Sequence, residues 1–286
     1  MSLLIIGGVT IDTLHLPGRE EPVTTAGGAG MYTALAAHHF FIHHPHLLQP
    51  GVAPPTLFAQ RPRPLPEILH PIARTLAWIG PEIPPPDLPR LEIAHYGGGK
   101  ASLLHADWGA QAHLTPDALP ETLTGYTCIH LAVMVSAQRQ LDFLRVCRER
   151  SQAFIAASSN GKTAWTETEA VRALIRQTDL FFMNENEANA IFGGVDHARA
   201  EPGKRLFITL AERGVLVLEK EARTLLPALS VREVDPTGAG DTFCGATLAG
   251  LASGWEAIPA AREGVWLAAK MIQGVGPEKL LGSEAS

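Results

Sequence analysis

The sequence has few cysteines, no long apolar run and no excess of basic residues, and each of these shortages excludes a class of protein. Its three cysteines, Cys128, Cys147 and Cys244, are too few and too irregularly spaced for a disulfide framework or a cysteine-based zinc site, which favours a reducing compartment. No segment approaches the roughly 18 consecutive apolar residues of a membrane helix. The N-terminus lacks the basic region of a secretion signal and reads as a strand. We therefore expect a cytoplasmic protein that does not associate with a membrane.

The charge balance argues against a nucleic acid as partner. The formal net charge is −6 and the basic residues are scattered, so no broad basic field exists to attract a phosphate backbone. A length of 286 residues with 46% apolar content is enough for a sizeable core. We expect residues 1–286 to form one domain whose partner is a small molecule.

Apolar strand-like segments alternate with helical patterns along most of the chain. Strands are predicted near residues 3–8, 128–135, 153–157, 180–183, 206–210 and 215–219. Helices are predicted near residues 28–39, 138–150, 167–177, 185–192, 240–253 and 257–273. This alternation predicts an α/β fold with a mostly parallel central sheet covered by helices on both faces. Ligands of such sheets bind beyond the carboxyl ends of the strands.

Three stretches depart from this alternation. Residues 50–89 hold twelve of the 22 prolines, which predicts extended surface loops, one helical passage over 67–78 and a remodelled sheet edge. Residues 91–113 read as a glycine-centred hairpin and, together with residues 13–25, predict a small β lid that would exclude water from a reaction. The histidines between residues 38 and 46 are better explained by a solvated helix end than by a metal site.

The most informative motif, Asp-Pro-Thr-Gly-Ala-Gly-Asp-Thr over residues 235–242, places a glycine turn and a carboxylate at the start of a predicted helix. The first turn of a helix offers N–H groups without internal partners at the positive end of the dipole, so it attracts a phosphoryl group. Gly238 and Gly240 let the backbone approach that group closely. Asp241 would repel a bound phosphate, but it could accept a proton from a substrate hydroxyl. The alternative is an ordinary acidic residue favoured by the helix dipole.

Residues 235–243 closely resemble the C-terminal signature of the ribokinase-like (PfkB) carbohydrate kinase family. Further matches follow in the family's order: the strand Leu3–Ile6 with Asp12, the glycine pair in 27–30, the Asn-x-x-Glu element Asn184–Glu187, and the nucleotide strand from Thr209 to Gly214. The resemblance implies ATP-dependent transfer of a phosphoryl group to a hydroxyl of a small sugar, polyol or nucleoside, with Mg²⁺. It also leaves open a homodimer formed through the lid.

The resemblance assigns a role to each matching residue. The catalytic group would comprise Asp241 as general base and the amides of Gly238, Ala239 and Gly240 as anion hole. The substrate group would comprise Asp12, Gly27, Gly28 and Tyr32. The cofactor group would comprise Asn184, Glu187, Thr209, Gly214 and Thr237. Glu187 would hold Mg²⁺ through water, and the backbone at Asp235 could bind K⁺.

Some of these residues have a second explanation. Asn184 and Glu187 could form an ordinary helix cap with an acidic first turn, and Asp12 could form a turn after the first strand. Tyr32 stands where many sugar kinases have asparagine, so it could stack on a ring or fill the core. Ala211 replaces a glycine common in the nucleotide strand.

Two other functions remain open on the sequence alone. The departures at Tyr32 and Ala211 are compatible with a kinase fold that binds a small molecule for regulation without catalysis. A dinucleotide-dependent oxidoreductase rests only on the glycines at residues 28–33, which no strand immediately precedes in the predicted pattern.

Overall fold

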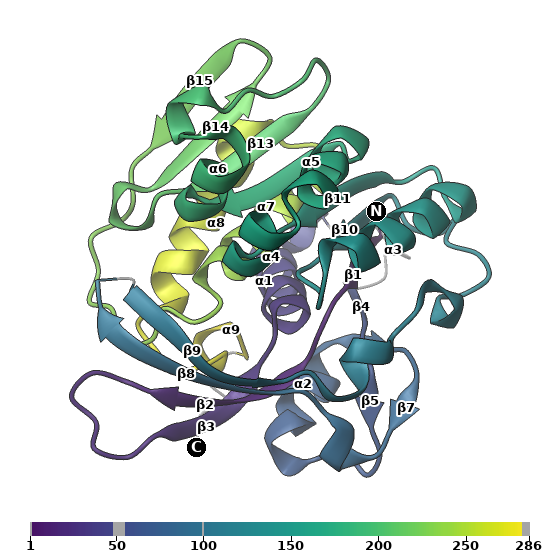
Figure 1. Cartoon of the computed structure of the whole chain (residues 1–286), viewed down its shortest axis with the longest axis vertical. Helices are drawn as coiled ribbons and strands as arrows, with labels where there is room; N and C mark the ends of the chain where they lie inside the picture. The colour runs from purple at the N-terminus through teal and green to yellow at the C-terminus, as the bar shows by residue number, and fades with distance from the viewer. Residues whose placement is uncertain (1, 48–54, 99, 282–286) are drawn as a thin grey trace.

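The computed structural model describes residues 2–47, 55–98 and 100–281. A nine-stranded sheet runs through the centre in the order β15-β14-β13-β12-β11-β10-β1-β4-β6 (Figure 1). Neighbouring strands from β13 to β6 are parallel, whereas β14 and β15 extend the β13 edge as antiparallel strands. The predicted α/β fold with a mostly parallel sheet is confirmed. The strands are β1 (Leu3–Ile6), β4 (Thr56–Phe58), β6 (Ala77–Ile79), β10 (Cys128–Leu131), β11 (Phe154–Ser158), β12 (Leu180–Asn184), β13 (Arg205–Thr209), β14 (Val215–Glu219) and β15 (Ala222–Leu226).

Helices cover both faces of this sheet because its central strands are apolar on both sides. In β1, Leu3 and Ile5 belong to one core while Leu4 and Ile6 belong to the other, as the twofold alternation of a strand requires. The first core includes α1 (Ala29–His43), α2 (His70–Thr75), α7 (Ala239–Ala252), α8 (Ala257–Met271) and α9 (Glu278–Leu281). The second includes α3 (Ala137–Arg150), α4 (Gly161–Thr166), α5 (Thr168–Gln177) and α6 (Glu185–Phe192). No described helix is both long and apolar enough to cross a bilayer.

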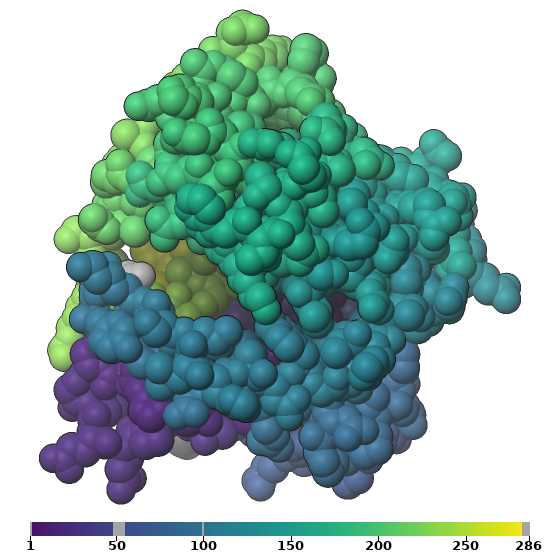
Figure 2. Space-filling view, in the orientation of Figure 1, coloured from purple at the N-terminus to yellow at the C-terminus, as the bar shows by residue number. Residues whose placement is uncertain are grey.

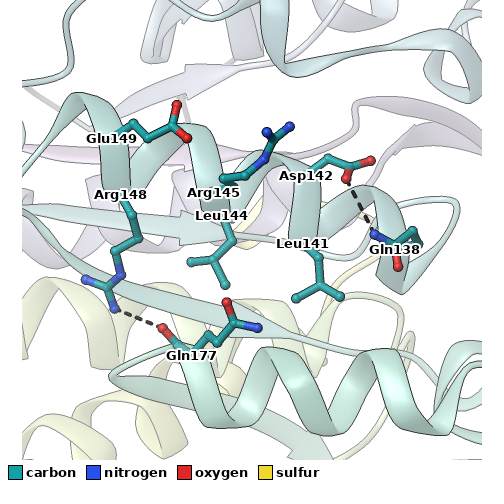
Figure 3. A pocket seen from close by; sticks show the side chains of 8 residues that line it. All are labelled: Gln138, Leu141, Asp142, Leu144, Arg145, Arg148, Glu149 and Gln177. Carbon is teal, nitrogen blue, oxygen red and sulfur yellow. Dashed lines mark hydrogen bonds between the residues drawn. The ribbon is translucent and has the colours of Figure 1, made fainter.

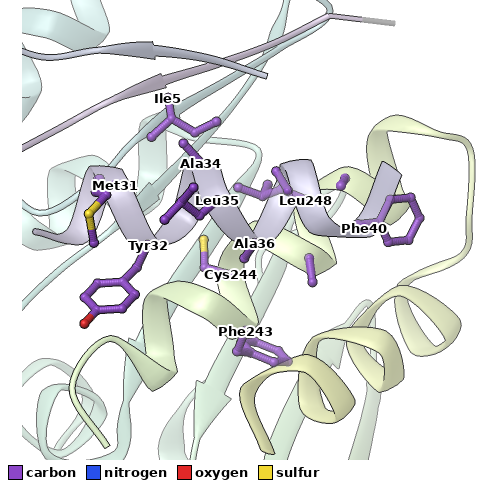
Figure 4. Close-up of a cluster of buried hydrophobic side chains, with 14 of the residues drawn as sticks. Ile5, Met31, Tyr32, Ala34, Leu35, Ala36, Phe40, Phe243, Cys244 and Leu248 are labelled. Atoms are coloured by element: carbon purple, nitrogen blue, oxygen red, sulfur yellow. The ribbon is translucent and has the colours of Figure 1, made fainter. Parts of the chain in front are cut away.

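Helices α1 and α7 pack closely, and their contact fixes where α7 begins. Leu35 and Ala36 of α1 face Cys244 and Leu248 of α7 in the core (Figure 4). A methyl group at Gly245 would overlap the Thr33 carbonyl oxygen, so glycine is needed for this approach. The first turn of α7 is therefore held against the start of α1.

A second, four-stranded sheet, called here the smaller sheet, lies beside the carboxyl end of β1. Its order is β3-β2-β8-β9, with β2 parallel to β8 and both outer pairs antiparallel. The strands are β2 (Thr10–His15), β3 (Val23–Gly27), β8 (Arg90–Gly97) and β9 (Lys100–Asp107). Residues 13–25 and 91–113, which were expected to form a lid, supply much of this sheet and the 3-10 helix η4 (Gly109–His113). Gly99, in the predicted hairpin turn, lies outside the described residues.

The proline-rich segment is more regular than the predicted surface loops. Its residues 50–54 lie outside the described residues, but β4 and β6 that follow extend the central sheet beside β1, and Leu57 and Phe58 are buried. The prediction of loops was wrong for β4 and β6, because strands of three residues are too short to show a clear period. The helical passage is shorter than predicted, as it consists of η2 (Glu67–Leu69) and α2. A parallel pair, β5 (Arg61–Pro62) and β7 (Glu82–Ile83), completes the segment.

The end of α1 also differs from the sequence interpretation. The helix continues to His43, and His39 is buried with its ring stacked on that of His43 at 4.2 Å between centroids. His39 lies against Lys270 of α8, with Nζ 3.3 Å from Nε2. It therefore belongs to a helix–helix contact and not to a solvated end. Within the described ranges, no group of three or more histidine, cysteine, aspartate or glutamate residues could hold a metal ion.

Candidate active site

The start of α7 has the geometry of an anion-binding turn. Gly238 caps the helix in the left-handed region at φ 78°, where a side chain is strained. A methyl group there would also lie 2.5 Å from the ring of Tyr32. The Ala239 amide donates to the Pro236 carbonyl oxygen at 3.1 Å, so Gly238 and Gly240 are the better candidates to donate outward from the open helix end.

Asp241 lies in the first turn of α7 and is partly buried. Burial raises the pKa of its carboxyl group to about 7. A hollow opens between the β8–β9 hairpin and the body of the molecule, and its floor has the colour of the C-terminal part of the chain (Figure 2). A carboxyl group with this pKa can accept and release a proton near neutral pH.

Asp12 was expected just beyond a strand, but it lies within β2 of the smaller sheet and is 1% exposed. Thr10 Oγ1 donates to its Oδ1 at 2.5 Å, and a methyl group at Gly27 would overlap the carboxylate. Burial is the largest effect that raises the pKa of Asp12 to about 7, and the negative charge of Asp235 adds to it. The carboxyl group is thus held between the Thr10 hydroxyl and the backbone of Gly27.

Tyr32 packs at the start of α1, with its ring against Gly238 and its hydroxyl pointing away from the apolar cluster (Figure 4). It is 1% exposed, and its hydroxyl has no hydrogen-bond partner among the described residues. Burial raises the pKa of Tyr32, and the charges of Asp235, Asp12 and Asp241 raise it further. The side chain fills the core with its ring and brings a polar group toward three carboxylates.

Gly28 sits beside these groups because the backbone needs it there. Its φ of 103° and the 2.5 Å approach of an added methyl group to the Gly8 carbonyl oxygen both require glycine. The structure therefore places Gly27 and Gly28, with Asp12 and Tyr32, around the junction of β3 and α1.

Asp235 and Thr237 anchor the turn that precedes α7. The carboxylate of Asp235 accepts from the amide of Thr237 at 2.9 Å and from the amide of Gly276 at 2.8 Å. His95 of β8 places Nε2 2.8 Å from Thr237 Oγ1 and 3.7 Å from Asp235 Oδ1. The side chains of Asp235 and Thr237 thus hold the turn in shape, which leaves their backbone oxygens as candidate ligands.

Asn184 and Glu187 form a capping box at the start of α6. Asn184 Oδ1 accepts from the Glu187 amide at 3.0 Å, and Glu187 Oε2 accepts from the Asn184 amide at 3.1 Å and from the Ser159 hydroxyl at 2.9 Å. Glu187 is 3% exposed and not solvated as a simple helix start would be. Burial raises its pKa to about 7, and the charge of Asp241 contributes, so the two carboxylates lie within electrostatic range of each other.

The predicted nucleotide strand ends in a tight connection between β13 and β14. Thr209 is the last residue of β13, and η7 (Ala211–Arg213) leads to Gly214. Gly214 has φ 100°, and a methyl group there would overlap the Leu226 carbonyl oxygen, so this turn requires glycine whatever it binds. Ala211 has φ 51°, a left-handed conformation that is strained for alanine.

Gln111 was missed by the sequence reasoning because it belongs to no motif. It lies in η4, is 7% exposed, and packs on Gly8, where an added methyl group would be 2.6 Å from Oε1. Its Oε1 is buried without a partner among the described residues. A buried amide oxygen at the carboxyl end of β1 is a natural acceptor for a ligand hydroxyl or amine.

Two other hollows lie away from Asp241. A groove of about 610 Å³ between α3 and α5 has Leu141 and Leu144 among its lining and mixed charges around them (Figure 3). A hollow of about 450 Å³ lies beside η4, where Gln60 Nε2 donates to the Ala110 carbonyl oxygen at 2.6 Å. Neither contains the carboxylates described above.

Comparison with known proteins shows the family to which this chain belongs. The model of the pfkB family carbohydrate kinases matches residues 99–281, well over half of the chain. The chain belongs to the pfkB carbohydrate kinase family. Membership makes it a sugar or nucleoside kinase of the ribokinase family, a phosphotransferase with a hydroxyl acceptor, and implies ATP as donor and usually Mg²⁺.

The chain is also similar to one curated kinase over most of its length, and solved kinase structures share its fold. A cytidine kinase of Thermococcus kodakarensis is 26% identical over 263 residues, which cover 89% of this chain and 90% of the relative. The structure of an adenosine kinase from Sinorhizobium meliloti matches with a TM-score of 0.79 at 19% identity, covering 98% of this chain and 97% of that one. The structure of a ribokinase from Cryptococcus neoformans in complex with ADP matches with a TM-score of 0.74 at 19% identity, covering 98% of this chain and 96% of that one.

Proposed function

We propose that this chain transfers the γ-phosphoryl group of ATP to a hydroxyl group of a small neutral sugar, polyol or nucleoside, with Asp241 as the general base. The observation that carries the proposal is the position of Asp241, a partly buried carboxyl group with a pKa raised to about 7 at the open end of α7. The family assignment supports the reaction class, and the geometry supports the residue.

In the proposed step, the acceptor hydroxyl loses its proton to Asp241 while its oxygen attacks the γ-phosphorus, and the bond to the leaving ADP oxygen breaks. The amides of Gly238 and Gly240 lie at the start of α7, where they and the helix dipole would stabilise charge on the transferring group. The Ala239 amide, already bonded to Pro236, contributes less. An anion hole of this kind acts mainly on the transition state.

The carboxylate oxygens of Glu187 and Asp241 suit a magnesium ion that is bound through water molecules. Both carboxylate oxygens of Glu187 are bonded to Asn184 or Ser159, so direct coordination would break the capping box. A hydrated Mg²⁺ near Glu187 and Asp241 would offset their mutual repulsion and neutralise phosphate charge. We assign the K⁺ site to the backbone oxygens at Asp235, because each oxygen of the Asp235 side chain already accepts a hydrogen bond.

The nucleotide would lie toward the carboxyl ends of β12 and β13. Thr209 and the turn ending at Gly214 lie there beside Asn184, which pairs with Thr209 in the sheet register. We assign Thr209, Gly214 and Asn184 to this side of the site. The Thr237 hydroxyl is bonded to His95, so we assign Thr237 to shaping the turn and not to a direct side-chain contact with ATP.

The acceptor would lie between Asp12, Tyr32 and Gln111. The surroundings of Tyr32 include three carboxylates, so a phosphorylated acceptor would meet like charge whereas a neutral one with several hydroxyl groups would find acceptors. Because one relative is a cytidine kinase, nucleosides are the first class of acceptor to test. The smaller sheet would act as the lid over this site, and its exposed Leu103 and Leu104 on β9 are the candidate surface for a homodimer.

A screen for ATP consumption tests the proposed function. Cytidine, adenosine, ribose, inositol and fructose would be compared with fructose 6-phosphate, which adds charge to the same skeleton. We expect turnover with at least one neutral compound and at least about tenfold lower kcat/KM for the phosphorylated one, given a like-charge interaction of several kcal/mol at short range. Binding of a neutral compound without any ATP consumption would instead favour a regulatory protein that has lost catalysis.

Replacing Tyr32 by phenylalanine tests its contact with the acceptor. The hydroxyl is buried without a partner in the described chain, so its removal should raise the free energy of unfolding by about 1 kcal/mol. If the acceptor supplies the partner, its KM should rise by roughly tenfold while kcat changes little. Steady-state kinetics and urea unfolding measure both, with Tyr126→Phe before β10 as control. An unchanged KM would leave Tyr32 as a core residue only.

A further inference from the structure

The contact between His95 and Thr237 joins the smaller sheet to the turn before α7, across 142 positions of sequence. The His95 side chain is 3% exposed and the Asp235 side chain 0%, so the contact is shielded from water. A shielded hydrogen bond is stronger and more directional than an exposed one. The position of β8 and the shape of the 235–238 turn are therefore coupled.

The same turn is held from two further directions. The amides of Val234 and Asp235 donate to the Ile272 carbonyl oxygen at 2.8 and 3.2 Å, and the Gly276 amide donates to Asp235. Thr25 of β3 packs so closely on Gly276 that a methyl group there would overlap its hydroxyl. Both β3 and β8 of the smaller sheet thus touch the scaffold of the turn, and the contact from β8 reaches Thr237, the residue next to Gly238.

We propose that His95 is a positioning residue for phosphoryl transfer, because its bond to Thr237 sets the orientation of the Gly238 amide and couples the anion hole to the smaller sheet. The inference rests on the proposed function of the Gly238 turn. His95 touches neither the acceptor nor the phosphate in this account. It acts on the rate of transfer and not on the affinity for the acceptor.

The geometry also favours one tautomer of the ring. Nε2 faces both the Thr237 hydroxyl and the Asp235 carboxylate, so we assign the proton to Nε2, as donor to Thr237 Oγ1. Nδ1 is buried without a partner among the described residues, which agrees with an unprotonated nitrogen. This assignment can be measured without any substrate.

A double-mutant cycle on the full-length protein tests the proposal. His95→Leu and Thr237→Val each remove the bond with little change in volume, and His95→Gln keeps a donor near the position of Nε2. We expect each single variant to lower kcat by about tenfold or more with acceptor KM within about threefold, as a slightly misplaced catalytic group does. The double variant should be no worse than the singles, and His95→Gln should recover most of the rate. His105→Leu on the exposed face of β9 is the control.

Several results would overturn the proposal. The first is a double variant in which the two decreases in kcat multiply. The second is a rise in the acceptor KM with unchanged kcat. The third is a normal kcat in His95→Leu while Asp241→Asn is inactive. The last result contradicts only this inference, whereas a fully active Asp241→Asn contradicts the proposed function. If His95→Leu does not fold, ¹⁵N NMR of the histidine rings decides: the Nε2–H tautomer of His95 should be present in the wild type and its Nε2 shift should move in Thr237→Val. A proton on Nδ1 or no response to Thr237→Val contradicts the assignment.

Discussion

Asp241→Asn lowers kcat by about 10² to 10⁴, the range expected for loss of a general base. Asparagine keeps the shape of the side chain at the start of α7 but cannot take the proton from the acceptor hydroxyl. Nucleotide binding, measured by calorimetry, should change little because the anion-hole amides remain. The exposed Asp117→Asn in η5 (Pro116–Ala118) is the matched control and should keep wild-type turnover. Equal kcat in Asp241→Asn and wild type would refute the assignment of the base.

The same substitution should make the protein more stable at high pH. Folding raises the pKa of Asp241 from 3.8 to about 7, so the stabilisation that its proton provides is complete below 3.8 and is lost as pH rises through 7. Asparagine does not titrate. The unfolding free energy of Asp241→Asn minus that of wild type should therefore grow from about pH 4 to 7, by at most about 1.4 kcal/mol per pH unit, and then level off. Urea unfolding at several pH values measures it, and a difference independent of pH contradicts the desolvated carboxyl group.

Gly238→Ala lowers kcat by about 10² to 10³, the loss typical of removing one oxyanion donor. The substitution introduces a side chain at φ 78° and pushes against the Tyr32 ring, so the turn must shift and the Gly238 amide moves away from the phosphate. Gly254→Ala, just beyond the other end of α7, is the matched control, because its φ is 87° but a methyl group there meets nothing within 4 Å.

Gly254→Ala should lose about 1 kcal/mol of stability from the left-handed backbone, measured by urea unfolding, and Gly238→Ala should lose more because of its overlap with Tyr32. Only Gly238→Ala should lose turnover. Equal turnover in the two variants would mean that the Gly238 turn does not stabilise the transferring group.

The central sheet could be predicted because its strands are buried on both faces and read as apolar runs. The segments near 180–183 and 206–210 were placed within one residue of β12 and β13. β4 and β6 could not be found in this way, since three residues between prolines show no period. β2 was also missed because threonines and Asp12 interrupt its apolar positions, although Ile11 and Leu14 are buried.

Some residues of the candidate site could likewise be predicted from the sequence and others could not. Residues in contiguous motifs, such as the 235–242 turn and the Asn184–Glu187 pair, could be proposed from the sequence because the motifs resemble those of the family. His95 and Gln111 could not, because their partners Thr237 and Gly8 are set by the docking of the smaller sheet and η4, over about a hundred residues of sequence or more. Spacing alone also left undecided whether Glu187 caps α6 or binds a metal. The structure shows that it is buried and takes part in the cap.

The product of the reaction tests the central claim most directly. Wild-type protein and Asp241→Asn, both shown to bind ATP, would be incubated with ATP, Mg²⁺ and the acceptor selected by the screen, and followed by ³¹P NMR. We expect the wild type to form ADP and a phosphate monoester in equal amounts, and Asp241→Asn to form neither at a comparable rate. Equal monoester formation by the two proteins, or ADP with free phosphate and no monoester, would contradict phosphoryl transfer to an alcohol deprotonated by Asp241.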